Sequence, residues 1–168
     1  MKHLIALCKI RISLLSTLSF AAGWILASGR LNPACIVLIT GTFFLACGAG
    51  ALNQVQERRT DALMERTRLR PIPAGKISKD LALLFALVQV ASGLMMLSFS
   101  MNPWVPGLGL FALIWYNGIY TPMKKKSRWA AIPGALVGSI PPVMGWAAAG
   151  GRLLDPQIMA VAFFMFLW

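Results

Sequence analysis

The sequence predicts an all-α fold, a polytopic bundle of transmembrane helices. The 168 residues are 58% apolar and only 12% charged, whereas soluble domains carry about 25% charged residues. Four stretches contain no Asp, Glu, Lys or Arg: 12–29, 31–56, 81–123 and 129–151. Because a membrane-spanning helix needs about 20 mostly apolar residues, each of these stretches holds at least one span.

The four stretches predict five full transmembrane helices and the start of a sixth. The longest stretch holds two helices, since Asn102-Pro103 in its middle favours a turn. A last apolar run, 158–168, is too short to cross a bilayer and is expected to begin the sixth helix. The first apolar run is longer than the core of a signal peptide, which favours a retained helix. We expect residues 1–168 to form a single membrane domain, the N-terminal part of a longer protein.

The formal net charge of +11 follows a topological pattern and does not indicate a nucleic-acid partner. If the helices alternate in direction, 14 of the 16 Lys and Arg residues lie on one side of the membrane, and only Arg30 and Arg152 lie on the other. This positive-inside pattern predicts a multi-pass protein of the bacterial inner (cytoplasmic) membrane, with its N-terminus and both long polar segments in the cytoplasm. Topology and attraction to anionic lipid head groups account for the basic run 124–128 without a further ligand.

Acidic residues are concentrated in one polar segment, 53–80, although membrane orientation requires no acids there. Four of the five acidic residues of the chain lie in it. Asn53, Glu57 and Asp61 are each four residues apart, so they share one face if the second span continues as a helix. Two carboxylates and an amide supply the hard oxygen ligands that Mg²⁺ prefers and usually shares with phosphate oxygens. These three residues are therefore candidate Mg²⁺ ligands.

Two arginines follow in the same segment. Arg66 and Arg70 are again four residues apart, and Pro71 and Pro73 then end any helix. Guanidinium groups bind phosphate through paired hydrogen bonds, so the segment 53–80 is a candidate cytoplasmic diphosphate-binding segment. The alternative is that the same acids and arginines form ion pairs on a solvated loop, and their spacing alone does not separate the two interpretations.

Longer patterns in the sequence match a known family. The run 53–75 reads Asn-x3-Glu-x3-Asp, then Met-x-Arg-Thr-x2-Arg-Pro-Ile-Pro-Ala-Gly. It resembles the first aspartate-rich motif and the following loop of the UbiA-type intramembrane prenyltransferases. A second block, 120–146, contains Tyr-Thr, a lysine run and Pro-Pro-Val-Met-Gly-Trp. Together the two blocks look most like the protoheme IX farnesyltransferase (haem O synthase) branch, and the likeness runs from about Lys9 to the end of the sequence.

Three features depart from the family pattern. Glu57 stands where the first motif usually has Asp, and residues 9–11 read Lys-Ile-Arg where Lys-Pro-Arg is common. The family fold has about nine helices and a second aspartate-rich motif in its C-terminal half, and this sequence ends before that motif. The histidine that follows the sixth helix in the family is absent too, and His3 near the N-terminus is a poor candidate for a haem ligand.

The resemblance implies a membrane-embedded farnesyltransferase that requires Mg²⁺. Its substrates would be farnesyl diphosphate and protohaem IX, its product would be haem O, and the farnesyl group would be joined to a haem vinyl group. The implied catalytic Mg²⁺ ligands are Asn53, Glu57 and Asp61. The implied diphosphate-binding residues are Arg66, Arg70 and Lys124. The substrate pocket is expected to include Tyr120, Gly138 and Pro142. With half of the diphosphate site missing, residues 1–168 alone are expected to be inactive.

Two other functions compete with this interpretation. A related prenyltransferase could act on a quinone or a chlorophyll precursor, although the Arg-Pro-Ile-Pro and Pro-Pro-x-x-Gly-Trp patterns argue for the haem branch. A non-catalytic membrane protein or transporter subunit is the alternative from another class. The predicted spans contain no Asp, Glu, Lys or Arg, whereas transport pathways usually include such residues.

Overall fold

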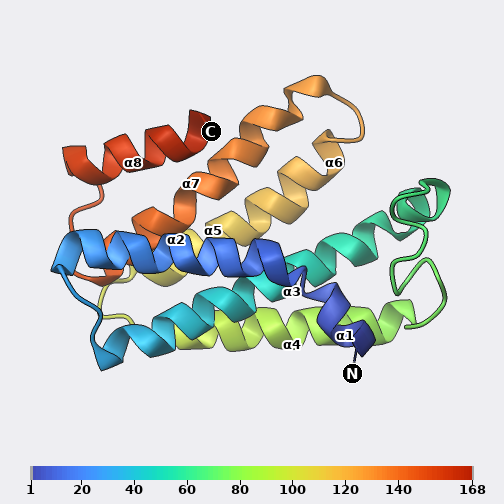
Figure 1. Ribbon diagram of the computed structural model, residues 1–168, viewed down its shortest axis with the longest axis horizontal. Helices are drawn as coiled ribbons and strands as arrows, with labels where there is room; N and C mark the ends of the chain where they lie inside the picture. The colour runs from blue at the N-terminus through green and yellow to red at the C-terminus, as the bar shows by residue number, and fades with distance from the viewer. Residues whose placement is uncertain (1, 168) are drawn as a thin grey trace.

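The computed structural model describes residues 2–167, and these form helices joined by turns, with no strand among them. Met1 and Trp168, the two ends of the predicted domain, lie outside the described residues. The long helices lie side by side in one bundle (Figure 1). The elements are α1 (Lys2–Leu7), α2 (Ile10–Ser28), α3 (Pro33–Leu63), α4 (Lys79–Leu97), α5 (Trp104–Ile114), η1 (Trp115–Tyr120), α6 (Thr121–Met123), η2 (Arg128–Ala130), α7 (Ala131–Ala148) and α8 (Pro156–Leu167).

The prediction of a polytopic helical membrane fold is confirmed. Within residues 2–167, four helices are long and apolar enough to cross a membrane: Ile10–Ser28, Pro33–Leu63, Lys79–Leu97 and Arg128–Ala148. The apolar helix Pro156–Leu167 is shorter and corresponds to the predicted start of a sixth helix. The turn predicted at Asn102-Pro103 is present, because α4 ends at Leu97 and α5 begins at Trp104.

The remaining predicted span is helical from Trp104 to Met123 but is not one regular α-helix. Residues Trp115–Tyr120 form a π-helical turn between α5 and α6. Pro122 has no backbone N–H to continue the α-helical hydrogen bonding, and the Thr121 N–H instead bonds to the carbonyl of Tyr116, five residues back. Such π-helical turns are frequent at functional sites, and this one faces α3.

Helix α3 is the longest element and carries the polar segment. It begins where the Asn32 side chain accepts a hydrogen bond from the Cys35 N–H and Pro33 occupies the first turn, a favourable helix start. It continues for 31 residues and ends at Leu63, where Met64 is extended. The predicted continuation of the second span through Asp61 is therefore confirmed. The helix stops before Pro71, so Arg66 and Arg70 lie in the following turns and not on the helix.

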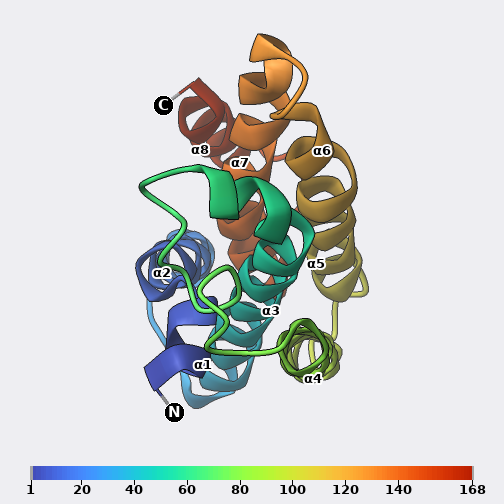
Figure 2. The same ribbon diagram turned by 90° about the vertical axis from the view of Figure 1, so that its right-hand side faces the viewer.

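The helices of the bundle pack very closely where glycine lies at their contacts. A Cβ added to Gly145 of α7 would lie 1.9 Å from the Phe20 carbonyl oxygen of α2, and one added to Gly93 of α4 would lie 2.5 Å from the Leu45 nitrogen of α3. Both neighbours are backbone atoms, so these positions accept no side chain. Small residues permit this close helix packing in membrane proteins, and it brings α2, α3, α5 and α7 together around a common interior (Figure 2).

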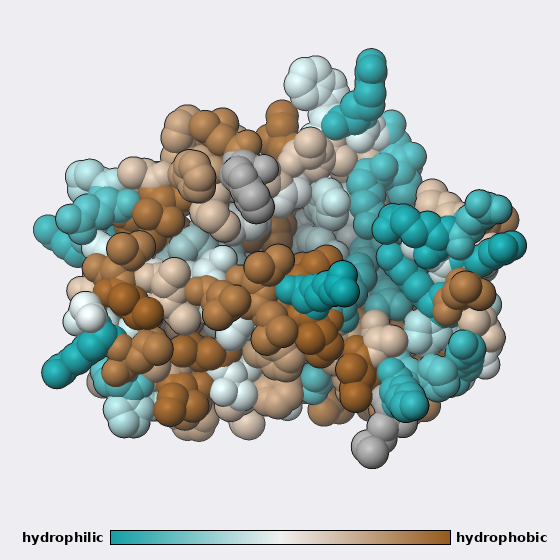
Figure 3. Space-filling view, in the orientation of Figure 1, coloured by the Kyte–Doolittle hydropathy of each residue, from teal (hydrophilic) through white to brown (hydrophobic). Residues whose placement is uncertain are grey.

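The surface is divided into a hydrophobic band and two hydrophilic ends (Figure 3). On the face shown, hydrophilic residues cover most of the end at which the turns after α3 and α6 lie, and fewer occur at the other end. Exposed apolar side chains of α2, such as Leu15 and Leu18, belong to the band. This is the surface of a multi-pass membrane protein, since lipid tails cover apolar side chains and the head-group regions accept charged ones.

Candidate functional site

The C-terminal half of α3 carries three buried polar side chains in the register that the sequence predicts. Asn53 is 0% exposed, Asp61 is 5% exposed and Glu57 is 7% exposed. Four-residue spacing places them along one side of the helix. A buried carboxylate requires a partner of opposite charge, so burial of these residues predicts that cations from other elements reach them.

Three cations from three different turns do so. Lys124 directly follows α6, and its Nζ lies 2.8 Å from a Glu57 carboxylate oxygen. The Arg70 guanidinium, from the turns after α3, lies 2.7 Å from an Asp61 carboxylate oxygen. The Lys9 amine, between α1 and α2, donates a hydrogen bond to the Asn53 amide oxygen. We call these six residues the mouth cluster: Lys9, Asn53, Glu57, Asp61, Arg70 and Lys124.

The mouth cluster contains more positive than negative groups. Its three cations face two carboxylates, and the Asn53 partner of Lys9 is neutral. Burial, together with the positive charges of Arg70 and Lys124, lowers the pKa of the Lys9 amine to about 8. The cluster therefore carries one more positive than negative charge, and an anion that binds among the three cations would balance it.

The π-helical turn fixes the amide residue of the cluster. The Asn53 Nδ2 donates to the Thr121 hydroxyl over 3.0 Å, and this hydroxyl in turn donates to the Tyr116 carbonyl over 2.8 Å. The Gln56 Nε2 donates to the Asn117 carbonyl over 3.2 Å. The bonds from Asn53 and Gln56 connect residues more than 60 positions apart. They orient the Asn53 amide so that its oxygen faces Lys9, an assignment that follows from the hydrogen-bond network.

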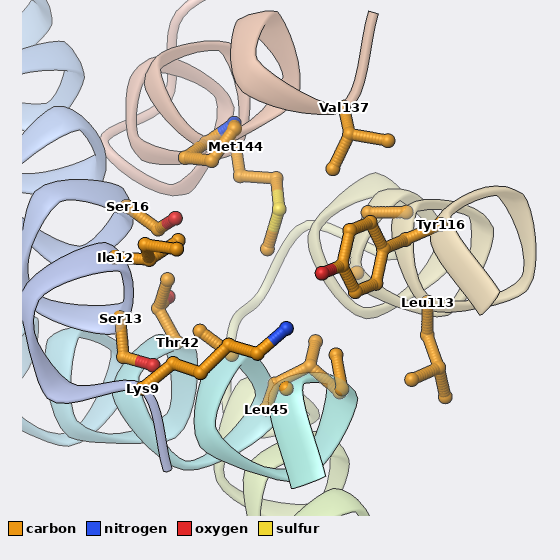
Figure 4. Close-up of a pocket in the computed structure, with 16 residues that line it drawn as sticks. Lys9, Ile12, Ser13, Ser16, Thr42, Leu45, Leu113, Tyr116, Val137 and Met144 are labelled. Atoms are coloured by element: carbon orange, nitrogen blue, oxygen red, sulfur yellow. The ribbon is translucent and has the colours of Figure 1, made fainter. Parts of the chain in front are cut away.

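An apolar cavity of about 110 Å³ lies next to the mouth cluster, between α2, α3, α5, η1 and α7. Figure 4 shows the Lys9 amine and the Tyr116 ring reaching into it from opposite sides. Apart from these two, most of its lining is aliphatic, and the Ser13 and Thr42 hydroxyls donate to backbone carbonyls of Cys8 and Leu38. The lining residues include Ile12, Leu45, Ala46, Ala49, Gly109, Ala112, Leu113, Val137, Pro141 and Met144. Such a cavity suits a hydrocarbon chain.

Of the other residues that the sequence predicts for the site, some lie at the mouth cluster and others lie away from it and from the cavity. Arg66 is exposed and forms no ion pair with a described residue, whereas Arg70 belongs to the mouth cluster. Tyr120 lies beside the cluster, with the Lys124 Nζ 5.3 Å from its ring centroid. Gly138 and Pro142 do not line the cavity; their neighbours Val137 and Pro141 do.

Packing explains the position of the two α7 residues. The backbone of Pro142 faces Gly23 of α2, where an added Cβ would lie 2.0 Å from the Pro142 oxygen. Gly138 is exposed, and nothing lies within 4 Å of an added Cβ. Glycine spacing and the Pro-Pro pair mark α7 in the sequence, but they do not indicate which side of the helix faces the interior.

Sequence reasoning missed two residues of the site. Lys9 was noted only as part of the Lys-Ile-Arg stretch, and its left-handed backbone conformation, with φ of 46°, gave no sequence signal. Tyr116 precedes the predicted Tyr120 by four residues and stacks on it, with ring centroids 5.5 Å apart. The π-helical turn that contains Tyr116 lies just before Pro122, and this proline was the one feature of the sequence that could have indicated the turn.

The donor set of the mouth cluster fits Mg²⁺ in one specific way. Among residues 2–167, no group of three or more His, Cys, Asp or Glu side chains could hold a metal ion by itself. Glu57 and Asp61 supply two carboxylates, and Asn53 adds an amide oxygen. Mg²⁺ is usually bound by one or two carboxylates together with water and substrate phosphates, so this set suits an ion that arrives with a phosphate ligand.

The family model of the UbiA prenyltransferase family matches residues 14–168. The chain belongs to this family. As a UbiA family member it has curated relatives named protoheme IX farnesyltransferase: it is 40% identical over 164 residues to that of Geobacter sulfurreducens, covering 98% of this chain and 60% of the relative. It is 41% identical over 148 residues to the mitochondrial one of Homo sapiens, covering 88% of this chain and 33% of the relative. The chain thus spans less than two thirds of the length of these relatives.

Solved structures of two other proteins show the same fold. A digeranylgeranylglyceryl phosphate synthase matches with a TM-score of 0.85 and 16% identity, over 99% of this chain and 58% of that protein. A UbiA homologue of Archaeoglobus fulgidus, bound to DMAPP and Mg²⁺, matches with a TM-score of 0.76 and 17% identity, over 98% of this chain and 60% of that one. At this identity the likeness establishes the fold alone.

Proposed function

We propose that the protein transfers a farnesyl group from farnesyl diphosphate to a vinyl group of protohaem IX, giving haem O, and that the reaction requires Mg²⁺. The observation that carries the proposal is the mouth cluster, in which three cations and two buried carboxylates lie beside an apolar cavity. A diphosphate joined to a hydrocarbon chain has the chemistry of these two neighbouring regions. The names of the relatives at 40% identity support the choice of farnesyl and haem.

Each charged residue of the cluster then has a role. Glu57, Asp61 and Asn53 would hold Mg²⁺, which supplies charge stabilisation to the diphosphate oxygens. Arg70, Lys124 and Lys9 would leave their present partners in part and donate hydrogen bonds to those oxygens, stabilising the negative charge that develops as the diphosphate leaves. The segment 53–80 would accordingly serve as the diphosphate-binding segment, and Arg66 would act only if the turns after α3 moved towards the cluster.

The cavity explains how the carbon chain is kept from water. Its lining would hold the allylic chain with C1 near the mouth cluster, and the aromatic face of Tyr116 would lie beside the positive charge that develops there. The haem vinyl group is a carbon nucleophile. It needs only access to C1, and no side chain has to activate it. As the vinyl carbon bonds to C1, the C1–O bond to the diphosphate breaks and a carbocation is left next to the macrocycle. Water adds to this carbocation and loses a proton, which the released diphosphate can accept, and the hydroxyethylfarnesyl substituent of haem O results.

Location follows from charge. We infer that the mouth cluster faces the cytoplasm of a bacterial cell, because 14 of the 16 Lys and Arg residues lie in the three segments that contribute to it, 2–11, 58–79 and 124–128. Cysteine-labelling at Ser127 and at Ser100, which lie in turns at opposite ends, would test this: an impermeant reagent applied outside intact cells is expected to label only Ser100→Cys.

The direct test of the reaction uses the protein expressed from its complete reading frame in membranes free of other haem farnesyltransferases. Incubation with haem, farnesyl diphosphate and Mg²⁺ is expected to give a farnesylated haem in the chromatogram, and EDTA is expected to abolish it. Quinone and chlorophyll precursors are offered in parallel. Prenylation of one of these acceptors, with haem unchanged, would replace haem as the substrate.

A further inference from the structure

We propose that the cavity is a closed-ended channel whose depth, set by Leu45, Gly109 and Met144, selects a farnesyl chain over shorter and longer prenyl donors. The proposal rests on the proposed function, because it treats the cavity as the site of the donor's hydrocarbon chain. It assigns to named residues a donor specificity that the charged residues of the mouth cluster do not explain.

The first observation is that the cavity continues the face of α3 that carries the mouth cluster. Below Asn53, the lining residues of α3 are Gly50, Ala49, Ala46, Leu45 and Thr42. These follow the three- and four-residue spacing of one helix side. From Asn53 to Leu45 the helix rises by about 12 Å, which is of the order of an extended farnesyl chain.

The second observation is a change of side-chain size with depth. Near the mouth cluster, Gly50, Ala49 and Ala46 of α3 leave space. Four residues below Ala49, about one helical turn, the space narrows at Leu45, which meets Gly109 of α5. A Cβ added to Gly109 would lie 3.0 Å from the Leu45 Cδ2 and 3.4 Å from the Met144 Cε. These three residues therefore surround the deep end from α3, α5 and α7.

The third observation is what lies beyond them. Leu45 and Met144 belong to one buried cluster with Leu38, Leu97 and Val105. This packed core continues under the cavity, so a chain that reaches Met144 meets side chains and not lipid. Figure 4 shows the Met144 thioether extending into the cavity opposite Leu45. The deep end is closed by flexible side chains, and shortening one of them would lengthen the channel.

Leucine substitutions along α3 measure the depth directly. Ala49 lies about 6 Å and Ala46 about 10 Å below Asn53 along the helix axis. Ala46→Leu is expected to raise the preference for geranyl over farnesyl diphosphate by about tenfold or more, a typical effect of a misfit in an apolar pocket. Ala49→Leu is expected to exclude geranyl diphosphate as well and to leave dimethylallyl diphosphate as the best donor. Met144→Ala is expected to admit geranylgeranyl diphosphate.

The matched control is Ala91→Leu, which makes the same change at an exposed position of α4 and is expected to leave donor preference unchanged. Ala112→Leu narrows the cavity from α5 and serves as a second variant if Ala46→Leu does not fold. Thermal unfolding of each purified variant in detergent, with and without each donor and Mg²⁺, gives donor binding without reference to any acceptor.

Two readouts separate this proposal from the proposed function. If haem is not prenylated but the variants still shift donor binding in the order of their depth, the function is wrong and the channel stands. If haem is prenylated but Ala49→Leu and Ala46→Leu weaken all donors equally, or Met144→Ala gains nothing with the longest donor, the closed channel is wrong. The carbon chain would then leave the bundle sideways.

Discussion

The two ends of the bundle differ in the reach of their polar contacts. In the mouth cluster, Lys124 bonds Glu57 across 67 positions and Lys9 bonds Asn53 across 44. At the opposite end, the indoles of Trp24 and Trp146 each donate to a carbonyl six residues ahead, on Arg30 and Arg152. There the contacts mostly end helices locally, with one long bond from Asn102 to the Ala147 carbonyl. Within residues 2–167, charged side chains from distant parts of the sequence meet at the mouth cluster and not at the opposite end. This difference distinguishes a candidate site from a set of helix ends.

The largest effect is expected at Asp61, the less exposed of the two carboxylates. Asp61→Asn removes a proposed metal ligand and the partner of Arg70, and prenyl transfer is expected to fall by at least about 100-fold, as for other losses of charge stabilisation. Initial rates with haem, farnesyl diphosphate and Mg²⁺ measure this. Glu65→Gln, an exposed acid of the same segment, is the matched control and is expected to keep the full rate. Equal activity of both variants would contradict the assignment of the site.

The next effect separates stability from catalysis. Lys124→Gln leaves Glu57 buried without its cation, and since Lys124 itself is 28% exposed, the expected loss of stability is only about 1–2 kcal/mol. The double variant Glu57→Gln/Lys124→Gln should recover the stability but not the activity, because both roles towards the ligand are gone. Thermal unfolding and initial rates are measured on the single and double variants. Lys125→Gln, at an exposed position of the same turn, should change neither the stability nor the rate. A double variant that regains activity would contradict the proposed roles of Glu57 and Lys124.

A smaller effect distinguishes the two arginines that the sequence presents as a pair. Arg70→Gln is expected to raise the KM for farnesyl diphosphate by about tenfold, the value of one charge-assisted hydrogen bond. Arg66→Gln is expected to change it less than about twofold, because Arg66 is exposed and apart from the cluster. Saturation curves for the donor at fixed haem give both values. A larger effect at Arg66 would show that the turns after α3 close over the ligand.

Much of the fold could be predicted from periodicity and charge alone. The uncharged stretches locate the helices because lipid allows no unpaired backbone polar groups and few charges, and four-residue spacing placed Asn53, Glu57 and Asp61 on one side of a helix. The π-helical turn was not predicted, because it depends on how Pro122 alters hydrogen bonding in a helix packed against α3.

The partners of the acids could be predicted only in part. Resemblance to the family predicted Arg70 and Lys124 as site residues, but it predicted Arg66, Gly138 and Pro142 as site residues equally strongly. The sequence could not show that Gly138 and Pro142 turn away from the cavity, since the rotation of α7 is set by the contacts of Gly23 with Pro142 and of Gly145 with Phe20. Such contacts join residues more than 100 positions apart and leave no local pattern.

The smallest effect is expected at the opposite end of the bundle. Trp146→Phe keeps the aromatic bulk but removes the 3.0 Å hydrogen bond to the Arg152 carbonyl, which costs about 1 kcal/mol and lowers the unfolding temperature by about 3 °C. The rate and the KM of prenyl transfer should remain unchanged, because the bond only stabilises the turn after α7. Trp129→Phe, at a residue that is 73% exposed, is the control and should unfold like the parent protein. A loss of activity in Trp146→Phe without a loss of stability would mean that the two ends are coupled through α7, because Met144 of the cavity lies on the same helix.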